Sequence, residues 1–152
     1  MTIHCLYIFD RRGSCLYYQE WHRPLFTLSD NPDEDRKLMF GLNFSLKQLV
    51  SKMSPTECGG DPFLAAALFT LPPRPLIGVK RVDSSHYSLH SYESASGYRF
   101  VFSSSKDAPD LTPILWAVYQ KAFIGFVILN PLYEMGKPIT CPGFVHAVDA
   151  LV

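Results

Sequence analysis

The chain has 152 residues, enough for one domain with a hydrophobic core. Hydrophobic residues make up 47% of it and charged residues 18%, a balance typical of a folded globular protein and not of a disordered chain. The 14 basic residues equal the 14 acidic residues in number, so no cationic excess favours binding to nucleic acid or anionic membranes. A neutral, apolar-rich chain is also poorly protected against self-association, which favours a permanent protein partner.

Neither the cysteines nor the N-terminus indicates secretion. No CxxC pair is present, and we expect four reduced, structural thiols: Cys5, Cys15, Cys58 and Cys141. The N-terminal sequence has no basic segment ahead of a hydrophobic core, so it does not match a secretory signal. No uninterrupted apolar run reaches the roughly 18 residues that cross a bilayer. These features predict a cytosolic protein.

The first elements are predicted to form a β-hairpin. Ile3–Phe9 and Cys15–Trp21 are both β-prone, and Asp10–Gly13 between them has turn chemistry. Both runs are apolar at odd and at even positions. Because strands that are apolar on both faces are covered on both faces, we expect helices on both sides of this sheet.

A helix is predicted next, from about Pro32 to about Met53. Pro32 suits the first turn, acidic residues follow it, and Pro55 stops the helix. Six apolar residues recur at helical spacing and are predicted to face the core: Met39, Leu42, Leu46, Leu49, Val50 and Met53.

Phe40 and Phe44 lie roughly opposite this stripe, beside Lys47 and Ser51, at ~100° per residue. Two interpretations are open. The rings are half-exposed, or contact a loop of the same chain; alternatively, they form a protein-binding surface, because adjacent exposed aromatics mark contact sites. We nominate four residues on this side of the helix as a partner contact: Lys37, Phe40, Phe44 and Lys47.

The second half is predicted to contain an antiparallel meander and two helices. After an irregular, proline-broken stretch come three β-prone segments, Ile77–Val82, His86–Glu93 and Tyr98–Ser104. The helix at Asp110–Leu129 is apolar almost all round, so it should be covered by a last helix at Phe144–Val152 or by a partner chain. Its main stripe is predicted to be Leu111, Leu115, Val118, Tyr119, Ala122, Phe126 and Leu129.

The sequence offers little catalytic chemistry. It contains no phosphate-binding glycine loop and no GxSxG nucleophile turn. His86 and His90 would share one face of a strand, but two ligands do not make a zinc site. The acidic residues at Asp30–Asp35 are explained by a helix start. We therefore expect no catalytic residue, cofactor or metal, and a binding or scaffolding role.

Several segments, in this order along the chain, resemble the small longin-type subunits of the TRAPP (transport protein particle) vesicle-tethering complex. They are Leu6–Gly13 with Glu20-Trp21, Lys37–Leu46 with Val50–Pro55, Tyr87–Glu93 with Ser96-Gly97, and Val127–Leu132. The resemblance implies a single longin-like (profilin-like) domain over residues 1–152, of the α/β (α+β) class. Its five-stranded antiparallel sheet would carry one helix on one face and two on the other, in the order β-β-α-β-β-β-α-α.

The resemblance also implies a function. The chain would be a non-catalytic subunit, bound to other TRAPP subunits, of a core that acts as nucleotide-exchange factor for a Rab-type GTPase. The transport steps would be endoplasmic reticulum to Golgi and intra-Golgi, with the protein in the cytoplasm and peripheral at endoplasmic reticulum and cis-Golgi membranes. The alternative is a longin-domain adaptor of another trafficking complex, such as a sedlin-like subunit or a coat small subunit; a small enzyme is a third reading.

Two features depart from the family pattern. Residues 58–78 form an atypical inserted loop where the family has only a few residues, and the chain stops early at Leu151-Val152. Either the loop is specific to a lineage, or the sequence retains intron-derived residues and lacks its last exon.

Overall fold

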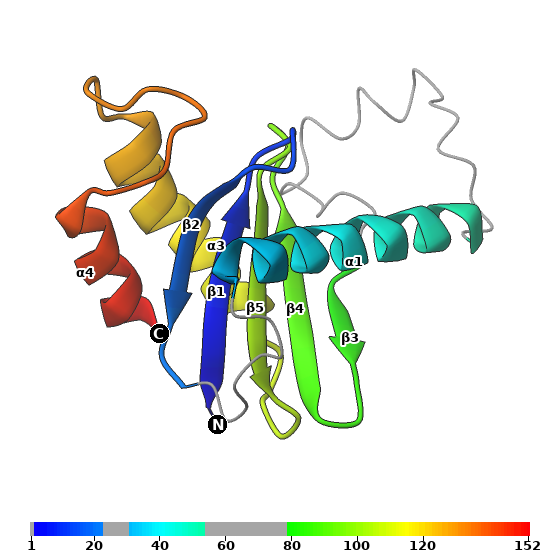
Figure 1. Cartoon of the computed structure of the whole chain (residues 1–152). Coiled ribbons are helices and arrows are strands. Elements are labelled where there is room, and N and C mark those ends of the chain that lie inside the picture. Colours follow the sequence, from blue (N-terminus) through cyan, green and yellow to red (C-terminus); the bar gives the residue numbers. More distant parts are fainter. Residues whose placement is uncertain (1, 23–30, 54–78) are drawn as a thin grey trace, which may run out of the picture.

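The computed structural model describes residues 2–22, 31–53 and 79–152 (Figure 1). Along these ranges the elements are β1 (Ile3–Phe9), β2 (Cys15–Glu20), α1 (Pro32–Met53), β3 (Arg81–Asp83), β4 (Tyr87–Glu93), β5 (Arg99–Ser105), α3 (Thr112–Ala117), the π-helix η1 (Val118–Ile128) and α4 (Pro142–Leu151). The inserted loop expected at 58–78 lies outside the described residues, as do Cys58 and the start of the predicted third strand.

The strands form one antiparallel sheet in the order β2-β1-β5-β4-β3. α1 crosses one face of this sheet, and α3, η1 and α4 lie on the other face (Figure 1). All seven residues of β1 are buried, as expected for a strand covered on both faces. The predicted architecture, one helix on one face and two on the other, is therefore confirmed, with α3 and η1 forming one continuous helical segment.

Two hydrophobic cores lie on the two faces of the sheet. The larger one joins the sheet to α3, η1 and α4, and its fully buried members include Leu6, Ile8, Phe100, Phe102, Leu115, Phe123 and Phe144. The smaller one lies on the side of α1 and consists of Cys5, Tyr7, Phe9, Leu89 and Val101. The larger core holds α3, η1 and α4 firmly, whereas α1 covers only a small apolar area.

The predicted stripe of the second long helix is wrong in its last turns. Phe126 and Leu129 are 38% and 71% exposed, whereas Phe123 and Val127 are buried. The reason is the π-helical geometry of η1, in which hydrogen bonds span five residues and each turn is wider than in an α-helix. The Leu129 N–H, for example, donates to the Ile124 carbonyl at 3.0 Å. The wider turn shifts the buried face away from the positions that a 3.6-residue period selects.

α4 covers η1, as the sequence predicted for a last helix. Gly143 brings the two helices together, because a Cβ atom there would lie 2.9 Å from the Phe126 ring. α4 is also joined to the strand β2 and the residue after it. The Asp149 carboxylate accepts hydrogen bonds from Gln19 Nε2 at 2.6 Å and from Trp21 Nε1 at 3.0 Å. None of the helices in the described ranges is both long enough and apolar enough to cross a membrane.

Candidate partner-binding surface

α1 begins and ends where its sequence favours a helix. Its first turn carries Asp33, Glu34 and Asp35, and its last turn carries Lys52. These charges lie at the helix ends that the backbone dipole favours for each sign. The Arg36 guanidinium also pairs with the Asp33 carboxylate at 2.8 Å, one turn away. The predicted helix boundaries are confirmed.

The face of α1 that touches the sheet is partly polar. The Phe40 ring packs edge-on against Phe9, with 5.5 Å between ring centroids. Further along, the buried Asn43 donates from Nδ2 to Ser91 Oγ at 3.1 Å. Lys47 Nζ then donates to both Glu93 carboxylate oxygens, at 2.7 and 2.8 Å. Polar groups of the sheet are thus paired by polar groups of the helix.

Gly13, in the turn between β1 and β2, permits the close approach of Phe40. Its φ angle of +90° lies in the left-handed region that favours glycine. A Cβ atom at this position would also lie only 2.8 Å from Phe40 Cε1. Because Gly13 has no side chain, Phe40 can pack directly against this turn, and the contact helps to position the first half of α1.

Another side of α1 presents apolar residues to solvent. Leu38 is 70% exposed, Leu42 40%, Leu49 53% and Met53 73%. At ~100° per residue these four side chains lie within about 60° of one another on the helix. We call them the outward stripe. Apolar residues that recur on one helix side and remain exposed mark a surface that another protein covers.

The predicted core stripe of this helix is therefore mostly wrong. Leu42, Leu49, Val50 and Met53 are exposed. Met39 does pack on the smaller core, and Leu46 is partly buried. The physical reason is that α1 must keep Phe40 on Phe9, Asn43 on Ser91 and Lys47 on Glu93, because the buried Asn43 amide is costly when unpaired and the other two contacts would be lost. This requirement fixes the rotation of α1 and leaves its leucines facing outward.

The structure brings three of the four nominated residues together. Phe40, Phe44 and Lys47 surround Arg99, whose guanidinium lies 5.3 Å from the Phe40 ring centroid and 5.7 Å from that of Phe44. Phe44 is 43% exposed, whereas Phe40 and Lys47 contact the sheet. Lys37 is exposed and takes no part in these contacts. For Phe40, the first interpretation applies, because the ring packs against the turn of its own chain.

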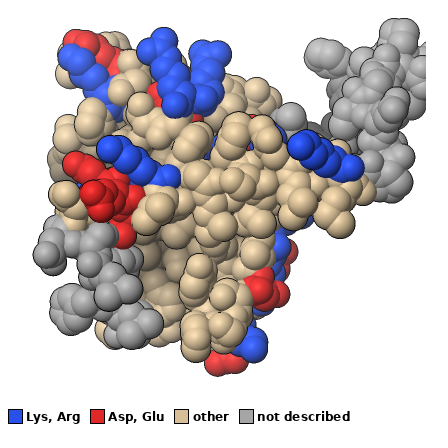
Figure 2. Space-filling view, turned by 45° about the vertical axis from the view of Figure 1, so that its right-hand side comes forward, with Lys and Arg blue, Asp and Glu red and all other residues tan. Residues whose placement is uncertain are grey.

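Figure 2 shows the side of the molecule that carries α1. Charged side chains lie mainly towards its margins, and uncharged residues fill the middle. A broad uncharged surface with charges at its rim has the anatomy of a protein–protein interface.

Within the described ranges, no cluster of three or more His, Cys, Asp or Glu is arranged to hold a metal ion. His86 is exposed, whereas His90 is fully buried beneath the start of α3. The Leu111 N–H donates to His90 Nδ1 at 3.4 Å, and His90 Nε2 lies 3.2 Å from Ser104 Oγ. These contacts give His90 a structural role. Cys15 and Cys141 are free thiols.

The chain matches a protein-family model and several known proteins in sequence. The model of the Sybindin-like family matches residues 3–152. The chain is 34% identical over 152 residues to trafficking protein particle complex subunit 1 of Homo sapiens, covering 100% of this chain and 92% of that protein. It is 27% identical over 142 residues to trafficking protein particle complex subunit BET5 of Saccharomyces cerevisiae, covering 87% and 76%. Among solved structures, the gliding protein MglB of Thermus thermophilus matches with a TM-score of 0.38 and 15% identity over 70% of this chain and 64% of that chain.

Proposed function

The chain belongs to the Sybindin-like family, and from this membership we propose that it is a non-catalytic subunit of a trafficking protein particle complex. The relatives that match nearly full length carry that name. The single observation on the molecule itself that supports the proposal is the outward stripe of α1. A helix that exposes a row of leucines and a methionine on one side is suited to be covered by a neighbour.

The proposed role is positional. Packed against sister subunits, the domain contributes part of a composite surface on which a Rab-type GTPase is held for nucleotide exchange. The transport steps are those between endoplasmic reticulum and Golgi and within the Golgi, and the complex is peripheral at those membranes from the cytoplasm. No residue of this chain takes part in bond making or breaking under this proposal.

The proposed contact surface combines the outward stripe with the four nominated residues. Lys37 and Phe44 offer exposed side chains, while Phe40 and Lys47 hold that side of α1 against the sheet. Full burial of a leucine or methionine side chain is worth roughly 1.5–3 kcal/mol. Covering four that are 40–73% exposed therefore contributes several kcal/mol to assembly.

The test is a variant with Leu38→Gln, Leu49→Gln and Met53→Gln, expressed with an affinity tag. Each exposed substitution should change the free energy of unfolding by only about 0.5 kcal/mol or less. Affinity purification with mass spectrometry should recover trafficking-complex subunits with the wild type and far fewer with the variant. Phe44→Asp tests the contribution of the four nominated residues. We change Phe44 and not Phe40, because Phe40 packs on Phe9 and its replacement would also disturb the fold.

A matched control keeps the same positions apolar, through Leu38→Met, Leu49→Met and Met53→Leu. This variant should assemble like the wild type. The assignment of α1 as the contact fails if the glutamine variant recovers the same subunits in the same amounts. Recovery of coat subunits in place of trafficking-complex subunits would favour the other adaptor class.

A further inference from the structure

We propose that a shallow recess beside the second half of α1 receives an acidic side chain from a neighbouring subunit. We call it the basic recess; it is lined by Phe44, Lys47, Gln48, Ser51, Lys52 and Arg99. The inference rests on the proposed function, since it names the chemistry of one contact within that assembly. Two observations support it: the balance of charge around Arg99 and the position of the recess on α1.

Arg99 is buried with hydrogen-bonding capacity left over. The residue is only 9% exposed, and its Nε and Nη1 atoms are buried without a hydrogen-bond partner. The Phe40 and Phe44 rings face its guanidinium, and rings attract a cation but accept no strong hydrogen bond. Both atoms are closed off from solvent, so an incoming carboxylate would meet Arg99 through the charge that it places at the wall of the recess, and not through hydrogen bonds to these two atoms.

The charges around the recess do not balance within the described residues. The Glu93 carboxylate pairs with Lys47 Nζ at 2.7 Å and lies 3.5 Å from Arg99 Nε. One carboxylate thus serves two cations, and Lys52 adds a third cation to the wall. A second carboxylate would restore the balance and form charge-assisted hydrogen bonds, which are roughly twice as strong as neutral ones.

The position of the recess indicates that this carboxylate comes from a protein. Lys52 directly precedes Met53 of the outward stripe, so a subunit packed on the end of α1 reaches both. The half-exposed Phe44 ring provides an apolar wall against which the methylene groups of a glutamate or aspartate side chain can pack. Charge complementarity of this kind sets the orientation of one subunit on another.

The first experiment uses the assembled recombinant complex and a carbodiimide, which joins an amine directly to a carboxylate. We expect a cross-link from Lys52 or Lys47 to an aspartate or glutamate of a neighbouring subunit. A cross-link from these lysines only to Glu93, in a complex that is otherwise intact, would contradict the proposal.

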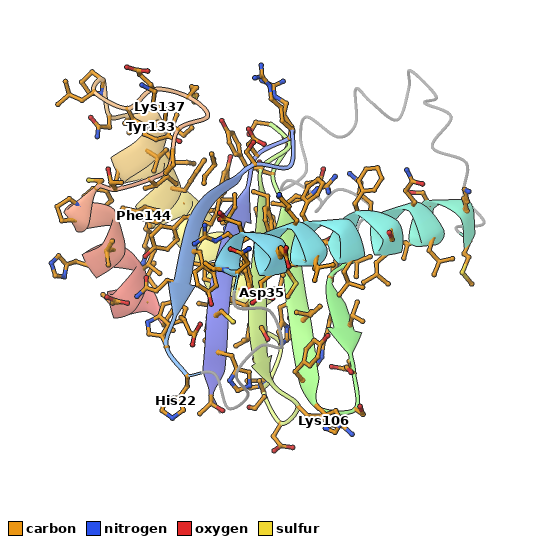
Figure 3. All side chains as sticks on the ribbon, viewed as in Figure 1. His22, Asp35, Lys106, Tyr133, Lys137 and Phe144 are labelled. Carbon is orange, nitrogen blue, oxygen red and sulfur yellow. The ribbon has the colours of Figure 1, made fainter. Side chains whose placement is uncertain are left out.

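The second experiment measures the affinity of the neighbour for this chain. Lys52→Glu should weaken binding on the order of tenfold or more at low salt, and Lys52→Gln by less. The matched control is Lys106→Glu, since Lys106 follows the end of β5 whereas Arg99 begins that strand (Figure 3). The control should bind like the wild type, and thermal melting of each variant should confirm an intact fold.

The outcomes separate the two proposals. If no trafficking subunit binds the wild-type chain, the proposed function fails. If the complex assembles but Lys52→Glu binds as tightly as Lys106→Glu, the basic recess is not a contact and the proposed function stands. If Lys52→Glu leaves subunit affinity unchanged but abolishes binding of the complex to phosphatidylserine vesicles, the recess serves a membrane and the proposal is overturned.

Discussion

His90 is a buried titratable residue whose surroundings favour its neutral form. Burial, and secondarily the nearby Arg81, lower its pKa below the ordinary value of 6.5, against the opposing effect of Asp110 and Asp83. The hydrogen bond from the Leu111 N–H to Nδ1 also requires that this nitrogen be unprotonated. His90 thus connects β4 to the start of α3 only while it is uncharged.

This gives a pH dependence with a definite sign. Between the folded-state pKa and 6.5 the unfolded chain binds more protons than the folded chain, so stability falls as the pH falls through this window. One such group contributes at most about 1.4 kcal/mol per pH unit. We therefore expect the free energy of unfolding to fall more steeply between about pH 7 and pH 5 for the wild type than for His90→Gln. Denaturant titrations at a series of pH values measure both.

The comparison isolates His90 from the carboxylates. The pKa values of Asp83 and Asp110 are lowered from 3.8, by hydrogen bonds from Ser88 and Thr112 first of all, so their stabilisation is lost only at more acidic pH. Equal slopes for the wild type and His90→Gln above pH 5 would show that His90 is not the group responsible.

At the level of the elements, the order and the approximate bounds of the strands and helices could be predicted from the sequence. Which side of α1 and of η1 faces the sheet could not. The turn residues around Asp10 and Pro32 and the double-sided apolar strands carry enough local information to place the elements. The rotation of a helix depends on distant partners. Lys47 and Glu93 are 46 residues apart, and no local pattern in the sequence pairs them.

The candidate surface could be predicted to a similar extent. The sequence directed attention to α1 and to Phe44, which is exposed. It did not predict the outward stripe, because leucines at helical spacing are typical of a core. Arg99 was missed as well, since it begins β5 and reaches α1 only through the folding of the sheet. Nothing in the sequence around an arginine at the start of a strand shows that it will belong to a binding surface.

The π-helix η1 leads to a prediction about which of two apolar residues stabilises the fold. Phe123 is buried against Tyr98 and Phe100, whereas Leu129 is 71% exposed. Phe123→Ala should lower the free energy of unfolding by about 3–5 kcal/mol. Leu129→Ala should change it by about 0.5 kcal/mol or less. Chemical denaturation measures both.

The two substitutions form a matched test of the helix phase. An α-helical period beginning at Leu111 places Leu129, and not Phe123, on the buried stripe. A larger loss of stability for Leu129→Ala than for Phe123→Ala would therefore contradict the π-helical assignment.

For the whole molecule, the apolar surface is unevenly distributed. The outward stripe lies on the α1 side, and a second exposed group, Leu129, Leu132 and Met135, follows the end of η1 on the other side of the sheet. The chain also has no net charge to keep copies apart. A molecule of this kind is stable as a fold but poorly suited to remain a solitary monomer.

We accordingly predict that the purified chain self-associates. Sedimentation velocity should show an average mass that rises with concentration, and the variant with Leu38→Gln, Leu49→Gln and Met53→Gln should shift this rise to higher concentrations. Addition of the cognate subunits should replace the self-association by a species of fixed mass. A wild-type chain that stays monomeric at every concentration would argue that the outward stripe attracts no partner.

The exposed apolar side of α1 also has a consequence inside the cell. A newly made copy without its neighbours displays the leucines that chaperones and degradation machinery recognise in incompletely assembled proteins, even though its own fold is finished. Its lifetime is then set by how fast it meets the sister chains. The amount of this protein should follow the supply of its scarcest neighbour more closely than the rate of its own synthesis.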